Sequence, residues 1–394
     1  ALNTPPPPLP DSPSPRLPDP AERLAATLRW DRPRAFCLGL VRSSTNVLLL
    51  LVAIRHFEAS PVAKGWLQGA MPLGLLLGPA AVALAARLGL PVARLSAFLL
   101  LLAAAGMAAA TAATSFPAYL AGILVAIPAA ICTIPLETEV WRQNAPAAVR
   151  GARFSGVFRA LVLGMLVAEA FDAAWLRDDV SRYRPILAVL TGALLCAAFL
   201  SLKIPSDPIA RRGQGPLRGM ATLWRDPMFG YVSASWMLLG FGNLGTLPLR
   251  VQYVAEERAG TAHPAWYVFL LVGLLPGALQ VATAPYWGRF FDRANFLWMR
   301  ILLNMLFLAS IACFFHPAWW MQAAGSVLLG IAQGGGGILW NMWVTRFAPP
   351  DRVAVTMGVH TFLTGVRGLA ASLLAFAAAA RYGYGPVAAG GILL

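Results

Sequence analysis

The chain has 394 residues, of which 58% are hydrophobic and 12% are charged, against about 25% charged residues in a typical soluble domain. This composition indicates a polytopic α-helical membrane protein and excludes an ordinary soluble domain. The net charge of +14 would suit a nucleic-acid partner, but positive charge in membrane proteins collects on cytoplasmic loops. We therefore expect no nucleic-acid partner, and we take the lipid bilayer as the surroundings of most of the chain.

The first stretch of the chain, residues 1–33, is rich in proline and contains the run PPPPLPDSPSPRLPDP. Proline favours the extended polyproline conformation and prevents a packed core, so we expect a disordered cytoplasmic tail. A ligand for a protein partner that recognises PxxP is the alternative interpretation. Because the chain starts without Met and stops at Leu394 inside an apolar run, we expect the last helix to be truncated.

Apolar runs long enough to cross a bilayer, which needs roughly 20 residues, follow one another along the rest of the chain. They lie near 35–57, 62–86, 92–114, 117–140, 154–175, 185–203, 228–250, 264–287, 297–316, 318–343 and 353–380, and a further run begins near Tyr384. The longest polar interruption, 204–226, separates the first six runs from the others. This spacing predicts a bundle over 34–203, a cytoplasmic linker over 204–226 and an incomplete bundle over 227–394.

The placement of lysine and arginine predicts the orientation of the chain. If the N-terminus is cytoplasmic, the inner segments hold more of these residues than the outer loops, as cytoplasmic segments do in most membrane proteins. We therefore expect a multi-pass protein of a bacterial inner membrane with its N-terminus in the cytoplasm.

The two halves of the chain repeat a short pattern. Trp141 and Gly156 precede Trp343 and Gly358 by one constant offset, at the same position relative to the flanking apolar runs. Such a repeat predicts a parallel duplication, with two six-helix bundles related by a pseudo-two-fold axis.

A loop motif links the chain to a known family. The run Gly288-Arg289-Phe290-Phe291-Asp292-Arg293 resembles the glycine–aspartate–basic loop signature of the major facilitator superfamily (MFS), and the likeness covers about residues 34–394. In the first copy of the loop, Ala93 stands where the acidic residue is expected. The resemblance implies an all-α fold of two six-helix bundles and transport by alternating access. The absence of an arginine from the fourth apolar run argues against a standard proton-antiport drug exporter.

The eleventh apolar run carries the strongest candidate for a substrate site. His360, Thr364 and Arg367 are spaced i, i+4 and i+7, so they share one face of a helix. An ionisable group at this depth is costly unless it faces a cavity or a partner. The face therefore predicts a site for an anionic or zwitterionic solute, and an internal ion pair between two helices is the alternative.

Polar residues in other runs extend the candidate substrate site. Arg42 and Asn46 are spaced i, i+4 in the first run, and Asn243 lies in the seventh. The resemblance implies that the first, fourth, seventh and tenth spans line the central cavity, so these side chains are expected to face it. Hydrogen bonding between helices is the alternative. In the tenth run Gln333 precedes four glycines, which predict either a bending gate or close packing against a neighbouring helix.

A carboxylate in the fifth apolar run is the candidate for proton coupling. Glu169 lies near the middle of that run, where desolvation disfavours the charged form of a carboxylate. A proton-coupled carrier could use it to bind a proton. Neutralising an arginine of another helix is the alternative role.

Charged residues near the cytoplasmic ends of the runs are candidates for gating. Asp292 is expected to hold the loop against the following helices and to favour the state closed to the inside. The gating set is Glu137, Arg150, Gly288, Asp292, Arg293 and Arg352.

The sequence as a whole predicts a secondary active transporter of a small anionic or zwitterionic solute, with proton symport as one scheme of coupling. It carries no nucleophile–base pair, phosphate-binding loop or metal-like cysteine spacing, so we expect neither an enzyme nor a cofactor. Two alternatives stay open. One is an exporter of amphipathic compounds or lipids, and the other is a non-transporting receptor or assembly factor that uses the Pro-rich tail.

Overall fold

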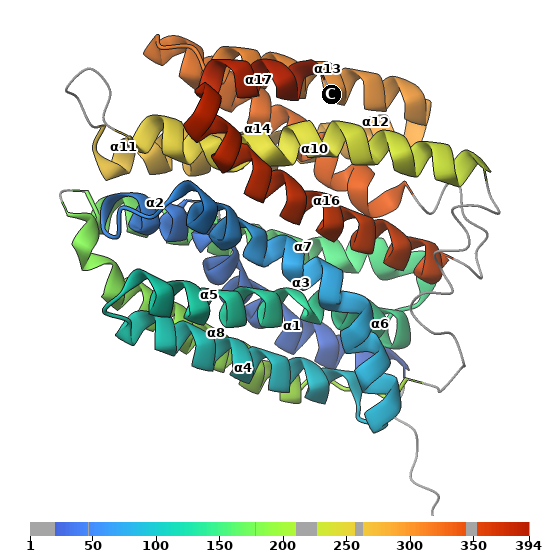
Figure 1. Ribbon diagram of the computed structural model, residues 1–394. Coiled ribbons are helices and arrows are strands. Elements are labelled where there is room, and N and C mark those ends of the chain that lie inside the picture. Colours follow the sequence, from blue (N-terminus) through green and yellow to red (C-terminus); the bar gives the residue numbers. More distant parts are fainter. Residues whose placement is uncertain are drawn as a thin grey trace, which may run out of the picture.

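The structure, a computed structural model, describes residues 20–45, 47–177, 179–209, 227–256, 263–343 and 353–393. These ranges form helices and contain no β-strand (Figure 1). The first half comprises α1 (Pro20–Ser44), α2 (Leu48–Arg55), α3 (Pro61–Leu88), α4 (Val92–Ala112), α5 (Phe116–Ile131), α6 (Thr133–Asn144), α7 (Ala147–Trp175), η1 (Val180–Arg182) and α8 (Tyr183–Leu202). The second half comprises α10 (Pro227–Ala255), α11 (Ala265–Phe269), η3 (Leu270–Leu274), α12 (Leu275–Arg293), α13 (Phe296–Phe314), α14 (Trp319–Met342), α16 (Val353–Tyr382) and α17 (Tyr384–Leu393).

The helices follow the predicted apolar runs, so the prediction of an all-α membrane protein is confirmed. In the described part of the chain, nine helical segments are long and apolar enough to cross a membrane. The run predicted at 62–86 is α3, and the run predicted at 297–316 is α13. Because the apolar length of a span is dictated by the bilayer, the positions of these helices could be read from hydropathy alone.

The start of α1 corrects the predicted extent of the tail. We expected residues up to 33 to be disordered, but α1 begins at Pro20. A proline fits the first turn of a helix, where its missing N–H is not needed. Farther along α1, Thr27 accepts a hydrogen bond from Asn144 at 2.9 Å, and Asp31 accepts one from the indole of Trp141 at 2.6 Å. These contacts to α6 fix a segment whose composition alone resembles a tail.

A break between α1 and α2 corrects a second expectation, the continuous helix through Arg42 and Asn46. The helix α1 ends at Ser44, and α2 begins at Leu48. The hydroxyl of Ser44 donates to the carbonyl of Val41 at 2.6 Å, and that of Thr45 donates to the carbonyl of Arg42 at 2.7 Å. Such local side-chain bonds compete with the backbone bonds that would continue a helix.

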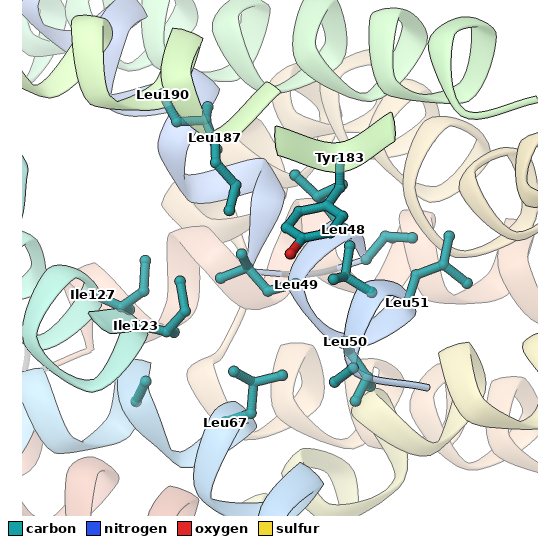
Figure 2. Close-up of a cluster of buried hydrophobic side chains, with 14 of the residues drawn as sticks. Leu48, Leu49, Leu50, Leu51, Leu67, Ile123, Ile127, Tyr183, Leu187 and Leu190 are labelled. Carbon is teal, nitrogen blue, oxygen red and sulfur yellow. The ribbon is translucent and has the colours of Figure 1, made fainter. Parts of the chain in front are cut away.

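The short helix α2 lies at the centre of the largest apolar core. Its residues Leu48 to Ala53 are all buried, and Figure 2 shows its leucines among side chains of α3, α5 and α8. The hydroxyl of Tyr119 on α5 donates to the carbonyl of Leu49 at 3.2 Å. A helix that is apolar all round is stable only when its neighbours cover every face, and here α10 of the second half of the chain packs against α2 as well.

The glycine run of α14 packs closely against its neighbours. The helix is continuous from Trp319 to Met342, and a Cβ atom built on Gly335 would lie 2.6 Å from both the Trp287 ring and a methyl group of Leu303. A Cβ atom built on Gly334 would lie 2.5 Å from the Thr283 hydroxyl, so the described structure supports the close-packing interpretation for Gly334 and Gly335.

The two halves of the chain meet chiefly where α3 packs against α16 (Figure 1). A Cβ atom built on Gly65 would lie 2.9 Å from the Cα of Leu373, and one built on Gly365 would lie 2.6 Å from the backbone nitrogen of Leu76. The two helices thus touch through their backbones. On the other side of the molecule, α7 packs against α11, η3 and α12.

Candidate functional site

The predicted stripe of α16 faces α10. Trp236, Gly240 and Asn243 are spaced i, i+4 and i+7, so they share one face of α10. The guanidinium of Arg367 lies directly against Gly240, where any Cβ atom would overlap it, and its Nη1 donates to the carbonyl of Trp236. The close approach of Arg367 to α10 therefore depends on the missing side chain at position 240.

The imidazole of His360 is enclosed by indole rings. Its ring centroid lies 5.6 Å from that of Trp236, 5.3 Å from that of Trp340 and 5.2 Å from that of Trp343. His360 is 2% exposed. We call the set of Trp236, Trp340, Trp343 and His360 the tryptophan cage; it brings together α10, the C-terminal end of α14 and α16.

A second arginine reaches the same cage from α13. The guanidinium carbon of Arg300 lies 4.3 Å from the ring centroid of Trp236, and that of Arg367 lies 5.9 Å from it. Arg300 also donates to the hydroxyl of Ser235 at 3.1 Å. Sequence reasoning missed Arg300 because it lies only a turn from the start of an apolar run, where arginine is common.

The tryptophan cage and the two arginines beside it hold several polar atoms that have no hydrogen-bond partner within the described ranges. They are Nε1 of Trp236, Nη1 of Arg300, Nε2 of His360 and Nε of Arg367. No described carboxylate forms an ion pair with Arg300 or Arg367. Buried polar atoms normally have partners, so this concentration of partnerless polar atoms marks the cage and the two arginines as the candidate binding site.

The other predicted substrate residues are placed unevenly around the cage. Asn243 lies one turn beyond Gly240, and its buried Oδ1 has no partner among the described residues. The Thr364 hydroxyl is already used, because it donates to the carbonyl of His360 at 2.8 Å. Gln333 is half-buried on α14, two turns before Trp340 and on the same face of that helix.

The structure places Arg42 apart from this site. It lies on the last turn of α1, in the first half of the chain, and its electrostatic neighbour is Glu137 on α6. Asn46 lies outside the described residues. Arg159 on α7 is exposed.

Glu169 lies where the two halves of the chain touch. It is 3% exposed on α7, and its carboxylate lies against Gly273, where a Cβ atom would overlap it. Gly273 belongs to η3, a π-helical turn between α11 and α12. Single π-helical turns are uncommon and often occur at functional sites.

The predicted gating residues are only partly described. Glu137 accepts hydrogen bonds from Arg34 at 2.8 Å and from Thr133 at 2.7 Å, so its partners belong to its own half of the chain. Gly288 is half-buried, and Arg293 is exposed at the end of α12. The side chains of Arg150 and Asp292 and the whole of Arg352 lie outside the described residues.

A polar contact that the sequence did not reveal joins the halves at the end of the molecule where α2 and α11 lie (Figure 1). We call it the α2–α11 end. Lys64 of α3 forms an ion pair with Glu256, just after α10, at 3.2 Å. Arg55 of α2 donates to the carbonyls of Ala255, at 3.1 Å, and of His263. These partners are about 200 residues apart in the sequence, so no sequence pattern predicted that they would meet.

The comparison with protein families decides the class. The sequence profile described as "Major Facilitator Superfamily" matches residues 35–389. The chain belongs to the major facilitator superfamily. It is thus a multi-pass membrane transporter and not an enzyme, as the sequence predicted.

Solved structures of other transporters share the fold of this MFS chain. The nucleoside transporter NupG is 14% identical, with a TM-score of 0.71, and the match covers 94% of this chain and 95% of that one. A bacterial homologue of the human lysosomal transporter Spinster, in an inward-facing and unoccupied conformation, is 17% identical, with a TM-score of 0.65 over 91% and 81% of the two chains. A D-xylose–proton symporter is 15% identical, with a TM-score of 0.61 over 95% of each chain. No curated protein matches the sequence significantly.

Proposed function

We propose that this MFS chain is a secondary active transporter that moves a small anionic or zwitterionic solute by alternating access. The observation that carries the proposal is the tryptophan cage with Arg367 and Arg300, two buried cations for which no described carboxylate forms an ion pair. A buried charge without a partner is costly. A solute that bears negative charge would relieve this cost while it is bound.

The arrangement of the halves supports alternating access. We propose that the halves are the bundles 34–203 and 227–394, joined by a linker over 204–226, and that the linker end faces the cytoplasm. The ion pair of Lys64 with Glu256 and the contacts of Arg55 would then close the outer side. In MFS transporters with two such repeats, rocking of one repeat against the other exposes the site to each side in turn.

Proton coupling through Glu169 completes the proposal. The carboxylate is buried at a contact between the halves, against Gly273. Burial disfavours the charged form of a carboxylate, so a proton bound at Glu169 would ease the movement of α7 past η3. The solved structure of a D-xylose–proton symporter with the same fold makes symport a reasonable scheme for this chain. We expect the pH dependence of transport to disappear in Glu169→Gln.

A thermal-shift screen of the purified protein tests the preference for anions. Anionic, neutral and cationic metabolites are added at equal ionic strength, and the midpoint of thermal unfolding is measured. We expect anions or zwitterions to raise the midpoint of the wild type and to leave that of Arg367→Ala unchanged, because a ligand that binds only the folded state stabilises it. Stabilisation by neutral or cationic solutes alone would contradict the proposal.

A further inference from the structure

The tryptophan cage places two buried guanidinium groups on one indole ring. Arg300 is 8% exposed and Arg367 is 5% exposed, and their guanidinium carbons lie 4.3 and 5.9 Å from the ring centroid of Trp236. Two like charges that share one apolar neighbour repel each other more strongly than they would in water. The Trp236 ring, the hydroxyl of Ser235 and the carbonyl of Trp236 compensate this repulsion only in part.

Two other buried cations of the described residues, Arg34 and Lys64, are neutralised by acidic side chains. Arg34 pairs with Asp31 at 2.7 Å and with Glu137 at 2.8 Å, and Lys64 pairs with Glu256 at 3.2 Å. The described ranges supply no such acid to Arg300 or Arg367. The two arginines beside the cage therefore lack the acidic partners that Arg34 and Lys64 possess.

The partnerless atoms of the cage are of the kind that bind oxygen. Nη1 of Arg300, Nε of Arg367 and Nε1 of Trp236 are N–H donors without an acceptor in the described ranges. Oxygen atoms of an anion would satisfy them through charge-assisted hydrogen bonds, which are stronger than neutral ones.

We propose that Arg300 and Arg367, together with the donor of Trp236, form a binding site for a small anion with two negative charges, such as a sulfate, a phosphate monoester or a dicarboxylate. This proposal rests on the proposed function and narrows it, because one negative charge would leave one of the two arginines unneutralised. Arg300 is then a residue that selects the substrate by charge.

A third buried arginine shows what a structural role looks like in this chain and supplies a control. Arg250 is fully buried on α10, donates to the hydroxyl of Ser310 at 2.8 Å, and lies 4.5 Å from the ring centroid of Phe314. It lies 14 residues beyond Trp236 on α10 and joins α10 to α13 through neutral groups. Its removal should therefore lower stability without changing the response to anions.

The test uses the purified full-length protein in detergent, with sulfate and succinate as dianion probes and acetate as the monoanion, all at constant ionic strength. We expect the dianions to change tryptophan fluorescence and to raise the thermal midpoint, and acetate to do neither at the same concentration. Trp236→Phe should lose the fluorescence change, because its indole is the one that both arginines contact. Arg250→Gln should keep the dianion response.

Arg300→Gln should weaken dianion binding at least about tenfold, the effect of roughly 1.4 kcal/mol of binding free energy. An equal response to acetate and to the dianions would overturn the proposal, and so would a dianion response of Arg300→Gln equal to that of the wild type. If Arg300→Gln does not fold, the comparison of acetate with the dianions on the wild type decides alone.

The outcome for the site is separable from the outcome for transport. Dianion binding that requires Arg300, in a protein that moves no solute across a membrane, would support the site and overturn the transport function. Uptake of an anion by wild-type and Arg300→Gln protein alike would overturn the site and support the transport function.

Discussion

A single missing side chain determines how Glu169 meets the opposite half of the chain. The carboxylate lies against the backbone of Gly273, and the π-helical geometry of η3 widens the helix at that turn. Any residue larger than glycine would push Glu169 away from the contact. The carboxylate is therefore buried by the backbone of the second half of the chain, and movement between the halves would change its exposure to water.

Glu169→Gln tests this residue directly. If Glu169 binds the coupled proton, we expect transport by Glu169→Gln to be constant between about pH 5 and 8, while transport by the wild type changes, because the amide cannot titrate. The measurement is the initial rate of uptake into proteoliposomes as a function of pH.

Asp172 is the competing carboxylate in that experiment. It lies on the same helix, three residues farther on, and is 2% exposed. Asp172→Asn should retain the pH dependence of the wild type. If the rate were constant with pH in Asp172→Asn and still pH-dependent in Glu169→Gln, the coupled proton would bind at Asp172 and not at Glu169.

Elements of the fold were predictable to the extent that hydropathy dictates them. The limits of α3 and α13 could be predicted from the length of their apolar runs. The break after Ser44 could not, because hydroxyl groups that hydrogen-bond to their own helix do not change its hydropathy. The stripe of His360 and Arg367 was found from helical spacing. Arg300 was not, because its proximity to Trp236 arises from packing between α13 and α10.

At the scale of one element, the glycines of α14 make unequal contributions. Gly335→Ala should destabilise the protein by about 1–3 kcal/mol, because the new methyl group would overlap Leu303 and the ring of Trp287. That ring cannot move freely, since its Nε1 donates to the carbonyl of Ile331 at 2.9 Å. The midpoint of thermal unfolding in detergent measures the effect.

Gly337→Ala is the control within the same helix. A Cβ atom at this position would meet nothing within 4 Å, and alanine favours a helix over glycine by about 1 kcal/mol. Gly337→Ala should therefore leave the midpoint unchanged or raise it. Equal destabilisation by both substitutions would show that helix flexibility, and not packing, explains the glycine run.

At the scale of the whole molecule, we expect polar contacts to hold the halves together at the α2–α11 end. In Lys64→Gln the ion pair with Glu256 is lost, so the population that is open at this end should rise. Spin labels at Val62 and Trp266, which are both exposed, report the separation of α3 and α11. We expect a longer distance to appear or grow in Lys64→Gln.

Arg142→Gln controls for a general effect of lost charge. Arg142 pairs with Glu139 three residues away on α6, so this pair does not join the halves. The distance between the spin labels should therefore be the same in Arg142→Gln as in the labelled protein that keeps Arg142. If Lys64→Gln also left the distances unchanged, the contact would not hold the halves together.

The most direct test of the central claim is uptake of anionic, neutral and cationic solutes of similar size by proteoliposomes that contain the wild type, Arg367→Gln or Arg250→Gln. The account predicts saturable uptake of an anion by the wild type, a loss of at least about tenfold in Arg367→Gln, corresponding to roughly 1.4 kcal/mol, and retained uptake in Arg250→Gln. Uptake confined to neutral or cationic solutes, or anion uptake by Arg367→Gln equal to that of the wild type, would contradict it.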